Sequence, residues 1–492
     1  MSDTERILPR PAFVASVAPR DLADARRLAP LVSGKASAIE YRLDLADGPV
    51  DPRALLSLDP RPVVATWRTT AEGGKFSGSR EEYRRLVGKA YEAGATIDIE
   101  LSSGLLSDPS LFSDRRRVIA SIHSPFALPA DYEEQLAAML ATGARAVKLV
   151  AGAADIRTAL AIAAIQKRQC SDSAAIFPMG PASAPGRVLS ALFGASLVFA
   201  PVERATAPGQ LPIEELLDVY GVDRPRRVDA LFGIVGREVS GSLSPLLHNA
   251  LFRARDLPHL YLPLPVSDFS RDKPQEISFD PPFRGFSVTD PWKQEAAATA
   301  VPSEDVVATR AANTLVFERG RWRAENTDVD GIFDPLADHD TGEGRTAVIL
   351  GAGGVARAAI VAARRIGYEV FVMSRRDEAA DALARELAVD SMASGDLAET
   401  EADLYLNATP IGSKQDDPPA FPQRVFEHRP LIFDCVYRRN GSSTPTILAA
   451  RAAHCPTVDG LQMFAAQAIR QARLFGAEGA TADEVARILE MR

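Results

Sequence analysis

The 492-residue sequence has few cysteines, no excess of positive charge and no long apolar run. Its three cysteines, Cys170, Cys435 and Cys455, are scattered, which argues against a disulfide framework and a cysteine-based metal site. The net charge of −9 disfavours nucleic acid, so an anionic ligand needs locally placed arginines. No segment is long enough to span a membrane, and "MSDTERILPRPAF" lacks a signal-peptide core. We therefore expect a cytoplasmic protein without nucleic-acid or membrane partners and without a metal; the oligomeric state stays open.

What is present is typical of globular proteins, with 46% hydrophobic and 25% charged residues. A chain of this length exceeds one ordinary core, which predicts roughly two to four domains.

Strand-like apolar runs recur through the first half, and helical patterns fill most of the gaps between them. The runs are 12–18, 37–44, 62–67, 95–101, 117–123, 145–150, 174–179 and 196–200, and the clearest helices are 79–94, 130–143 and 155–169. Alternating strands and helices predict a parallel sheet. Eight such units in about 220 residues fit a (β/α)8 TIM barrel, in which the chemistry lies at the C-terminal ends of the strands.

Lys148 lies inside the apolar run 145–150, where a buried ammonium is costly unless it is paired or neutralised. By this stretch alone, a lysine that reaches water from near a strand end is the simpler interpretation. However, other polar residues fall at the ends of the predicted strands and converge on one barrel mouth. They are Glu40, Arg42, Arg68, Glu72, His123, Arg187, Thr206 and Gln210.

This set of residues favours imine chemistry. A desolvated lysine beside other cations becomes a neutral amine, which attacks a ketone to form a Schiff base. The iminium acidifies the adjacent carbon, and a histidine with a near-neutral pKa removes that proton and later protonates the leaving hydroxyl. Arginines bind a carboxylate. The first half is therefore predicted to be an imine-forming lyase or aldolase for a small keto acid.

The segments "EYRLD", "TWRTTAEGGKF", "SIHSPF", "VKLV", "FPMGPASAPGR" and "ATAPGQ" together resemble type I 3-dehydroquinate dehydratase over residues 10–222. The resemblance implies that Lys148 forms the Schiff base, that His123 is the general acid/base, and that Glu72, on a loop that closes over the site, orients the histidine. It implies substrate binding by Ser16, Glu40, Arg42, Arg68, Arg187, Thr206 and Gln210, with Arg187 on the carboxylate. The departures from the family pattern are Ser124, Pro125, Gly186 and Thr206.

A glycine-rich turn in the second half has the form of a dinucleotide site. In residues 346–367 a strand, a turn and a helix follow one another, and Gly351, Gly353 and Ala356 match the fingerprint. Backbone N–H groups there approach a pyrophosphate at the helix N-terminus. The next strand ends in Ser374, Arg375 and Arg376, where NAD sites usually have an acid. Arginines suit a 2′-phosphate, so NADP is the predicted cofactor.

Lys293 and Asp328 are candidates for proton transfer in the second half. Lys293 follows a proline turn in "GFSVTDPWKQEA", and Asp328 follows a polar Asn-Thr pair in "AENTDVDG". Brought together, they could donate a proton to a carbonyl oxygen as hydride reaches its carbon. The commoner fate of such residues is an ordinary ion pair.

The segments "SGSLSPLLHNALF", "FSVTDPWK", "ANTL", "ENTD", "GAGGVARA", "LNATPIGS" and "DGLQMFAAQA" resemble shikimate dehydrogenase in order over residues 230–492. The resemblance implies that Lys293 and Asp328 are the catalytic pair. It implies shikimate binding by Ser242 and Ser244 (carboxylate) and by Thr289, Asn313, Tyr437 and Gln467 (hydroxyl ring). It implies NADP binding by Gly351, Ala352, Gly353, Gly354, Val355, Ser374, Arg375, Arg376 and Thr409, with Cys435 and Gly460 near the nicotinamide. The departures are Ser287, Val329 and the Ser-Arg-Arg sequence at 374–376.

Together these observations predict an α/β chain with a TIM barrel (1–222), a linker (223–229), a substrate domain (230–334), an NADP-binding Rossmann domain (335–460) and helices that return to the substrate domain (461–492). The predicted ligands are 3-dehydroquinate, 3-dehydroshikimate and shikimate, in two consecutive steps towards aromatic amino acids. Three alternatives stay open: a quinate dehydrogenase in the second half, against which the serine pair argues, an aldolase acting on a C–C bond, and a half that binds a ligand without catalysis and regulates.

Overall fold

The computed structural model describes residues 7–108, 110–169, 171–224, 226–339 and 344–490. Contacts divide the chain into two compact units between Arg227 and Val228, with residues 264–266 grouped with the first unit. This division falls inside the predicted linker. Cys170 lies outside the described residues.

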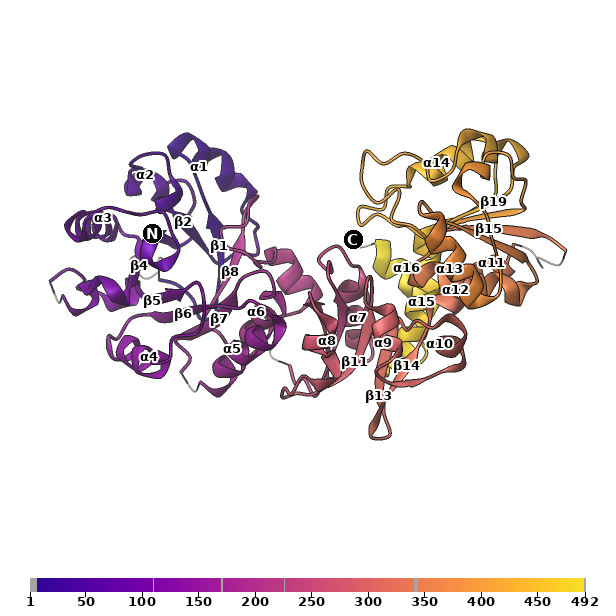
Figure 1. The fold of residues 1–492 in the computed structure, drawn as a ribbon. Helices are drawn as coiled ribbons and strands as arrows, with labels where there is room; N and C mark the ends of the chain where they lie inside the picture. Colours follow the sequence, from indigo (N-terminus) through magenta and orange to yellow (C-terminus); the bar gives the residue numbers. More distant parts are fainter. Residues whose placement is uncertain (1–6, 109, 170, 225, 340–343, 491–492) are drawn as a thin grey trace. The chain divides into compact units, whose positions relative to one another are not determined.

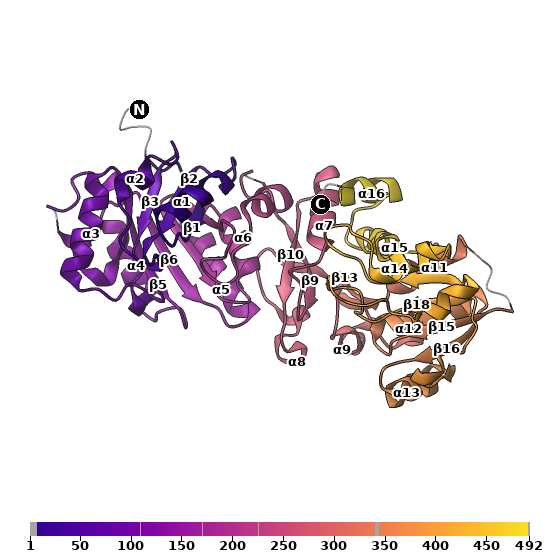
Figure 2. The same ribbon diagram turned by 90° about the horizontal axis from the view of Figure 1, so that it is seen from above.

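The first unit is a ring of parallel strands surrounded by helices (Figures 1 and 2). The strand order is β7-β6-β5-β4-β3-β2-β1-β8. At the two ends of this order, the backbone N–H of Ser196, just before β8, donates to the carbonyl of Ala174 in β7 (2.8 Å). The strands are β1 (Ala12–Val17), β2 (Ala38–Arg42), β3 (Val63–Thr66), β4 (Thr96–Glu100), β5 (Val118–Ser124), β6 (Ala146–Gly152), β7 (Ala174–Met179) and β8 (Leu197–Pro201). The helices are α1 (Leu22–Leu28), α2 (Pro52–Leu56), α3 (Arg80–Glu92), α4 (Tyr132–Ala141), α5 (Ile156–Arg168) and α6 (Ala184–Leu192). The predicted TIM barrel is confirmed, and every predicted strand overlaps an observed one.

Local sequence signals account for these elements. The side chain of Ser79 accepts a hydrogen bond from the N–H of Glu82 and begins α3, and Asp155 begins α5 in the same way through Thr158. Apolar residues of the strands fill the barrel core, which excludes water and gives the polar groups near the mouth a buried setting.

The second unit begins with a mixed sheet of order β10-β9-β11-β13-β14-β12. Its strands are β9 (Ala230–Gly236), β10 (His259–Pro265), β11 (Phe283–Val288), β12 (Val301–Pro302), β13 (Thr314–Glu318) and β14 (Arg321–Glu325), and its helices are α7 (Ser244–Ala254), α8 (Phe269–Asp272), α9 (Lys293–Ala297) and α10 (Glu304–Thr309). We refer to this part of the second unit as the substrate lobe.

A parallel sheet of order β17-β16-β15-β18-β19-β20 follows. It is built from β15 (Thr346–Leu350), β16 (Glu369–Met373), β17 (Asp390–Ser391), β18 (Leu404–Asn407), β19 (Leu431–Asp434) and β20 (Thr457–Val458). The helices are α11 (Asp328–Ala337), α12 (Gly354–Ile366), α13 (Asp377–Leu387), α14 (Pro445–Ala452), α15 (Gly460–Leu474) and α16 (Ala482–Glu490). The strand order changes direction between β15 and β18, which is the place where such sheets bind ligands. The predicted Rossmann fold is confirmed.

Helix α15 connects this second sheet to the substrate lobe. Phe464, Ala468 and Phe475 pack in one cluster with Phe232 and Leu247 of the substrate lobe. A side chain at Gly331 of α11 would meet Cβ of Gln467 at 2.8 Å, so the small residue permits the close crossing of α11 and α15.

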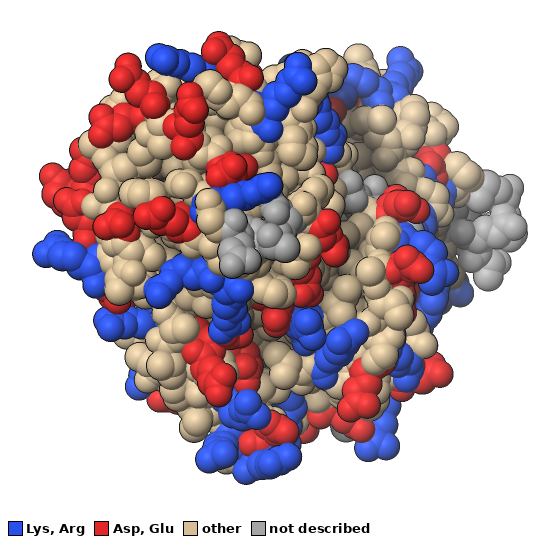
Figure 3. Space-filling model, turned by 90° about the vertical axis from the view of Figure 1, so that its right-hand side faces the viewer, with Lys and Arg blue, Asp and Glu red and all other residues tan. Residues whose placement is uncertain are grey.

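On the face of the molecule shown in Figure 3, acidic and basic side chains are interspersed. Within the described ranges, helices long and apolar enough to cross a membrane are absent.

Candidate active sites

A cavity of about 120 Å³ lies at the mouth of the barrel, where the strands end. It brings together most of the residues that the sequence singled out in the first half. Its lining includes Glu40, Arg42, Arg68, Glu72, His123, Lys148, Arg187, Thr206 and Gln210.

Lys148 lies in the middle of β6, earlier in the strand than predicted, and is only 3% exposed. The simpler interpretation, a lysine that reaches water, is therefore wrong. Its Nζ contacts a carboxylate oxygen of Asp98 on β4, and it lies 4.6 Å from the ring centre of Phe199 on β8. The lysine is thus paired with a carboxylate as well as desolvated.

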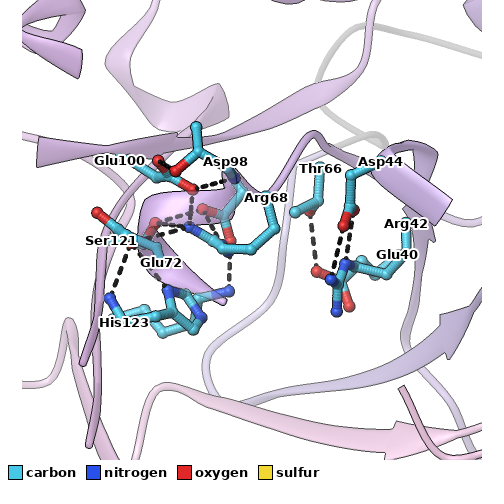
Figure 4. A network of polar contacts seen from close by, with 12 residues as sticks. Glu40, Arg42, Asp44, Thr66, Arg68, Glu72, Asp98, Glu100, Ser121 and His123 are labelled. Atoms are coloured by element: carbon cyan, nitrogen blue, oxygen red, sulfur yellow. Dashed lines mark hydrogen bonds and ion pairs between the residues drawn. The ribbon is translucent and has the colours of Figure 1, made fainter. Parts of the chain in front are cut away.

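Arg68 is the centre of a buried network of charges (Figure 4). Its guanidinium donates to Asp98 (2.9 Å) and Glu100 (2.9 Å), and it also contacts Ser121 (3.1 Å) and Glu72 (3.3 Å). A guanidinium held in this way has a fixed position, and the carboxylates around it balance its positive charge.

His123 on β5 and Glu72 are neighbours in the cavity. A carboxylate oxygen of Glu72 accepts the backbone N–H of His123 (2.8 Å) and lies 3.3 Å from its Nδ1. Burial raises the pKa of Glu72 to about 7. Burial, together with the charges of Arg68 and Lys148, lowers the pKa of His123 well below its usual range. The expectation of a near-neutral histidine pKa is therefore wrong, because burial and, after it, the surrounding cations disfavour the imidazolium.

Glu40 and Arg42 lie on the same side of β2, as their alternation predicted. Glu40 accepts hydrogen bonds from Ser16 (2.7 Å) and Thr66 (2.9 Å), and Arg42 is held by both oxygens of Asp44 (2.9 Å each; Figure 4). The fully buried Ser16 thus lies behind Glu40, and its role in substrate binding stays a prediction.

Arg187 differs from the other two arginines of this cavity. Its guanidinium lies 4.9 Å from the ring centre of Phe177, and its buried Nε has no hydrogen-bond partner in the described structure. Burial lowers the pKa of Arg187 to about 10.

The loop after β8 is shaped by Gln210, whose side-chain oxygen accepts hydrogen bonds from the backbone N–H and the hydroxyl of Thr206 (2.9 and 3.1 Å).

In the second unit, Lys293 begins α9 and Asp328 begins α11, and the two side chains meet at 2.5 Å. The other oxygen of Asp328 accepts from the amide of Asn313 (2.8 Å). The same amide donates to Thr327 (2.9 Å), whose hydroxyl reaches Gln467 (3.3 Å). Three predicted site residues are thus joined to the lysine through one hydrogen-bond network.

Ser287 forms a second chain of hydrogen bonds in the substrate lobe. The hydroxyl of Tyr261 donates to Ser287 (2.6 Å), and Ser287 donates to Gln471 (2.8 Å) on α15.

Three other predicted substrate residues have local contacts. The hydroxyl oxygen of Ser242 accepts a hydrogen bond from the backbone N–H of Ser244 (3.1 Å) at the start of α7. The ring of Tyr437 packs on Phe464 (5.1 Å between ring centres).

The glycine turn after β15 brings the backbone close to its neighbours. Gly351 has φ +133°, and a Cβ there would meet the carbonyl oxygen of Ala408 at 2.9 Å. A Cβ at Gly354, the first residue of α12, would meet Cδ of Lys293 at 2.8 Å. Gly354 is outside the glycine fingerprint, so the side chain of Lys293 gives a separate reason for a glycine here.

The remaining predicted cofactor residues surround the same edge of the parallel sheet. Ser374 follows β16 and bonds the carbonyl of Arg376, and the two arginine side chains are exposed. Thr409 bonds Asn407 after β18 (2.6 Å), and Gly460 approaches the carbonyl of Val436, where a Cβ would lie at 2.3 Å. Burial raises the pKa of the Cys435 thiol. Ala352 and Val355 complete the turn and the first residues of α12. A glycine cradle at a helix N-terminus, followed by exposed arginines, fits a phosphorylated dinucleotide.

The sequence interpretation missed several residues that the structure places in the barrel site: Asp44, Asp98, Glu100 and Ser121. A signal for two of them was present. Asp98 and Glu100 alternate in the predicted strand 95–101, so both face the same way as neighbouring site residues.

Comparisons with known proteins agree with this division of the chain. The family model described as type I 3-dehydroquinase matches residues 13–226, and the model described as shikimate dehydrogenase substrate binding domain matches residues 234–315. A bifunctional 3-dehydroquinate dehydratase/shikimate dehydrogenase of Arabidopsis thaliana is 29% identical over 473 residues, which are 89% of this chain and 77% of that protein.

A shikimate dehydrogenase (NADP(+)) of Ignicoccus hospitalis is 34% identical over 252 residues, which are 50% of this chain and 92% of that protein. Among solved structures, the dehydroquinate dehydratase and shikimate dehydrogenase from S. pombe AroM covers 98% of both chains, with 20% identity and a TM-score of 0.43. The chain therefore belongs to the shikimate dehydrogenase family through its second unit, which is joined in one polypeptide to a type I 3-dehydroquinase barrel.

Proposed function

We propose that the first unit dehydrates 3-dehydroquinate to 3-dehydroshikimate through a Schiff base on Lys148, and that the second unit reduces 3-dehydroshikimate to shikimate with NADPH. The observation that carries this proposal is that each unit holds a lysine with little exposure, in contact with an aspartate, at the place where its fold binds ligands.

In the barrel, the buried Nε of the Arg187 cation lacks a partner in the described structure, which suits the carboxylate of the substrate. The amine of Lys148 attacks the ketone, and the iminium draws electrons from the adjacent C–H bond. His123, whose lowered pKa keeps the ring neutral, accepts that proton and returns a proton to the departing hydroxyl. Glu72 orients the histidine through its backbone N–H and Nδ1.

In the second unit, Lys293 donates a proton to the carbonyl oxygen of 3-dehydroshikimate, and Asp328 holds the lysine in place. Asn313 fixes Asp328, while Ser242, Ser244, Thr289, Tyr437 and Gln467 bind the carboxylate and hydroxyl groups of the substrate. The residues that hold NADP are Gly351–Val355, Ser374, Arg375, Arg376 and Thr409, with Cys435 and Gly460 beside the nicotinamide. When bound, NADPH supplies the hydride that reduces the carbonyl carbon.

A single reaction tests both assignments. The purified full-length chain is mixed with 3-dehydroquinate and NADPH, and dehydroshikimate, shikimate and NADPH are followed together. We expect NADPH to be consumed and shikimate to accumulate. Dehydroshikimate that accumulates at constant NADPH would contradict the second assignment. If nothing reacts, the same assay with 3-dehydroshikimate isolates the second unit, and quinate with NADP or NAD tests the quinate alternative.

We also propose the predicted domain bounds (1–222, 223–229, 230–334, 335–460 and 461–492) and a cytoplasmic location. The division of contacts between Arg227 and Val228 supports the linker. Limited proteolysis tests it, because cleavage within residues 223–229 should release two fragments that remain folded.

A further inference from the structure

Asp98 lies at the centre of the barrel site, although none of the motifs of the sequence analysis contains it. It lies on β4 and is 1% exposed. One carboxylate oxygen accepts from Arg68 (2.9 Å) and from the hydroxyl of Ser121, and the other contacts Nζ of Lys148. Both oxygens are therefore occupied, and the second one is in contact with the Lys148 nitrogen.

The cations around Asp98 favour its charged form. Burial alone would raise the pKa of Asp98, but the positive charges of Arg68 and Lys148 hold that pKa well below its usual range. A buried carboxylate between two cations is costly to disrupt, because removal of one partner leaves the others uncompensated.

We propose that Asp98 is a catalytic residue of the dehydratase site, the counterion of the Lys148 nitrogen in the free enzyme and in the iminium. This inference rests on the proposed Schiff-base function of Lys148. It assigns to Asp98 a contact with the reacting nitrogen itself, which the motif residues do not provide.

The charge balance of imine formation favours such a fixed partner. The ammonium first gives one proton to a base; the amine then adds to the ketone carbon, and the carbonyl oxygen leaves as water after taking up two protons. The net change is R–NH₃⁺ + O=C → R–NH⁺=C + H₂O, so the nitrogen carries one positive charge before and after. A carboxylate that stays negatively charged can therefore stabilise both the ammonium and the iminium.

The other charged groups near Lys148 have different partners. Glu72 and Glu100 contact Arg68, and Glu40 accepts from two hydroxyls. Within the described part of the barrel, Asp98 is the carboxylate in contact with Lys148. The surrounding titratable and charged groups are Glu40 and Arg42 on β2, Arg68 and Glu72 after β3, Glu100 on β4, His123 on β5 and Arg187 on α6. Without Asp98, the described part of the barrel would leave the Lys148 nitrogen without a carboxylate in contact with it.

The test compares Asp98→Asn with the unchanged full-length chain. Without substrate, reductive methylation of Lys148 by formaldehyde and cyanoborohydride is measured by mass spectrometry across a pH series. We expect half-maximal modification of Lys148 to move down by about one to three pH units, because the ammonium loses its counterion. We also expect dehydration to slow about a hundredfold or more, because the iminium loses the same partner. An unchanged pH dependence of methylation would overturn the proposal.

Matched variants separate this role from a structural one. Ser121→Ala removes a hydrogen bond from Asp98 but leaves the carboxylate on Lys148, so the methylation curve should stay in place. Asp98→Glu keeps the charge and should leave the curve near that of the unchanged chain, even if turnover falls. If Asp98→Asn does not fold, the Asp98→Glu variant still tests the proposal. A shift of its Lys148 methylation curve to low pH would contradict the proposal, because this variant keeps the negative charge.

Borohydride trapping distinguishes failure of this proposal from failure of the proposed function. With 3-dehydroquinate, borohydride should attach the substrate skeleton to Lys148 in the unchanged chain. If no adduct forms there, the Schiff-base function is wrong. The methylation experiment still tests whether Asp98 stabilises the ammonium of Lys148. Reduction of 3-dehydroshikimate by the second unit should be the same in all variants, which confines the effect of the substitutions to the barrel.

Discussion

Each unit of the chain buries a lysine against an aspartate, but the two pairs have different surroundings. In the barrel, Lys148 and Asp98 project from strands, with side chains 4% and 0% exposed. In the second unit, Lys293 and Asp328 begin two helices, with side chains 12% and 7% exposed. The first aspartate also binds the guanidinium of Arg68, whereas the second binds the neutral amide of Asn313.

This difference corresponds to the two kinds of chemistry. A lysine that forms an imine ends the step with a positive charge on a nitrogen that is bonded to substrate, so a strong and permanent counterion suits it. A lysine that donates a proton ends the step neutral, so a partner held by neutral amides suits it better. The same two residue types thus serve two functions, and their neighbours set which one.

The largest expected effect comes from removing each lysine. Lys148→Ala should slow dehydration by at least about a thousandfold and spare the reduction, because the nucleophile is lost. Lys293→Ala should slow the reduction by about a hundredfold to ten-thousandfold and spare the dehydration. The two half-reactions are assayed separately, and Lys35→Ala, which removes an exposed lysine paired with Asp218, is the control. If either variant impaired both steps, the division of labour would be wrong.

Next in size is a pH effect on the stability of the barrel, because burial raises the pKa of a carboxylate in this site. The pKa of Glu72 is raised to about 7, so folding favours its protonated form. The unchanged chain should therefore lose stability as pH rises from about 4.5 to about 7, by about 3 kcal/mol at most. Glu72→Gln should remove this loss. Denaturant unfolding of both proteins at about pH 4.5 and about pH 8.5 measures it, and parallel pH dependences would refute the expectation.

Asp328→Asn should slow the reduction by about a hundredfold, because Lys293 loses the carboxylate that holds it. The dehydration should be unaffected. Asp334→Asn is the matched control, since Asp334 lies on the same helix and contacts Arg470 near the surface. Steady-state rates with 3-dehydroshikimate and NADPH give the comparison, and equal rates in the two variants would remove Asp328 from the catalytic pair.

The smallest expected effect is that of Gly354→Ala. A methyl group would press on the side chain of Lys293, so we expect the turnover number of the reduction to fall about tenfold. The affinity for NADPH, measured by fluorescence titration, should change less than turnover. Gly395→Ala, where a Cβ meets open space, is the control. A loss confined to NADPH affinity would show that Gly354 serves the cofactor alone.

Most of the architecture was predictable because it depends on local patterns. Alternation of apolar runs and helical segments predicted the barrel strand by strand, and the glycine turn predicted the dinucleotide fold. The motif residues of the barrel were also found, because C-terminal strand ends in a barrel face one mouth. The states of charge of these residues were not predictable from the sequence. The histidine was expected to titrate near neutrality, but burial in the folded chain, together with the cations around it, lowers its pKa.

The sequence by itself determined the order of elements, the two candidate lysines and the glycine cradle, since these depend on residue type and spacing along the chain. Only the tertiary structure decided which groups contact those lysines. Asp98 is 50 residues from Lys148 in sequence, and Gly354 is far from Lys293. Contacts of this kind arise from the packing of strands and helices that no local pattern records, and burial then shifts the pKa values of Glu72 and His123.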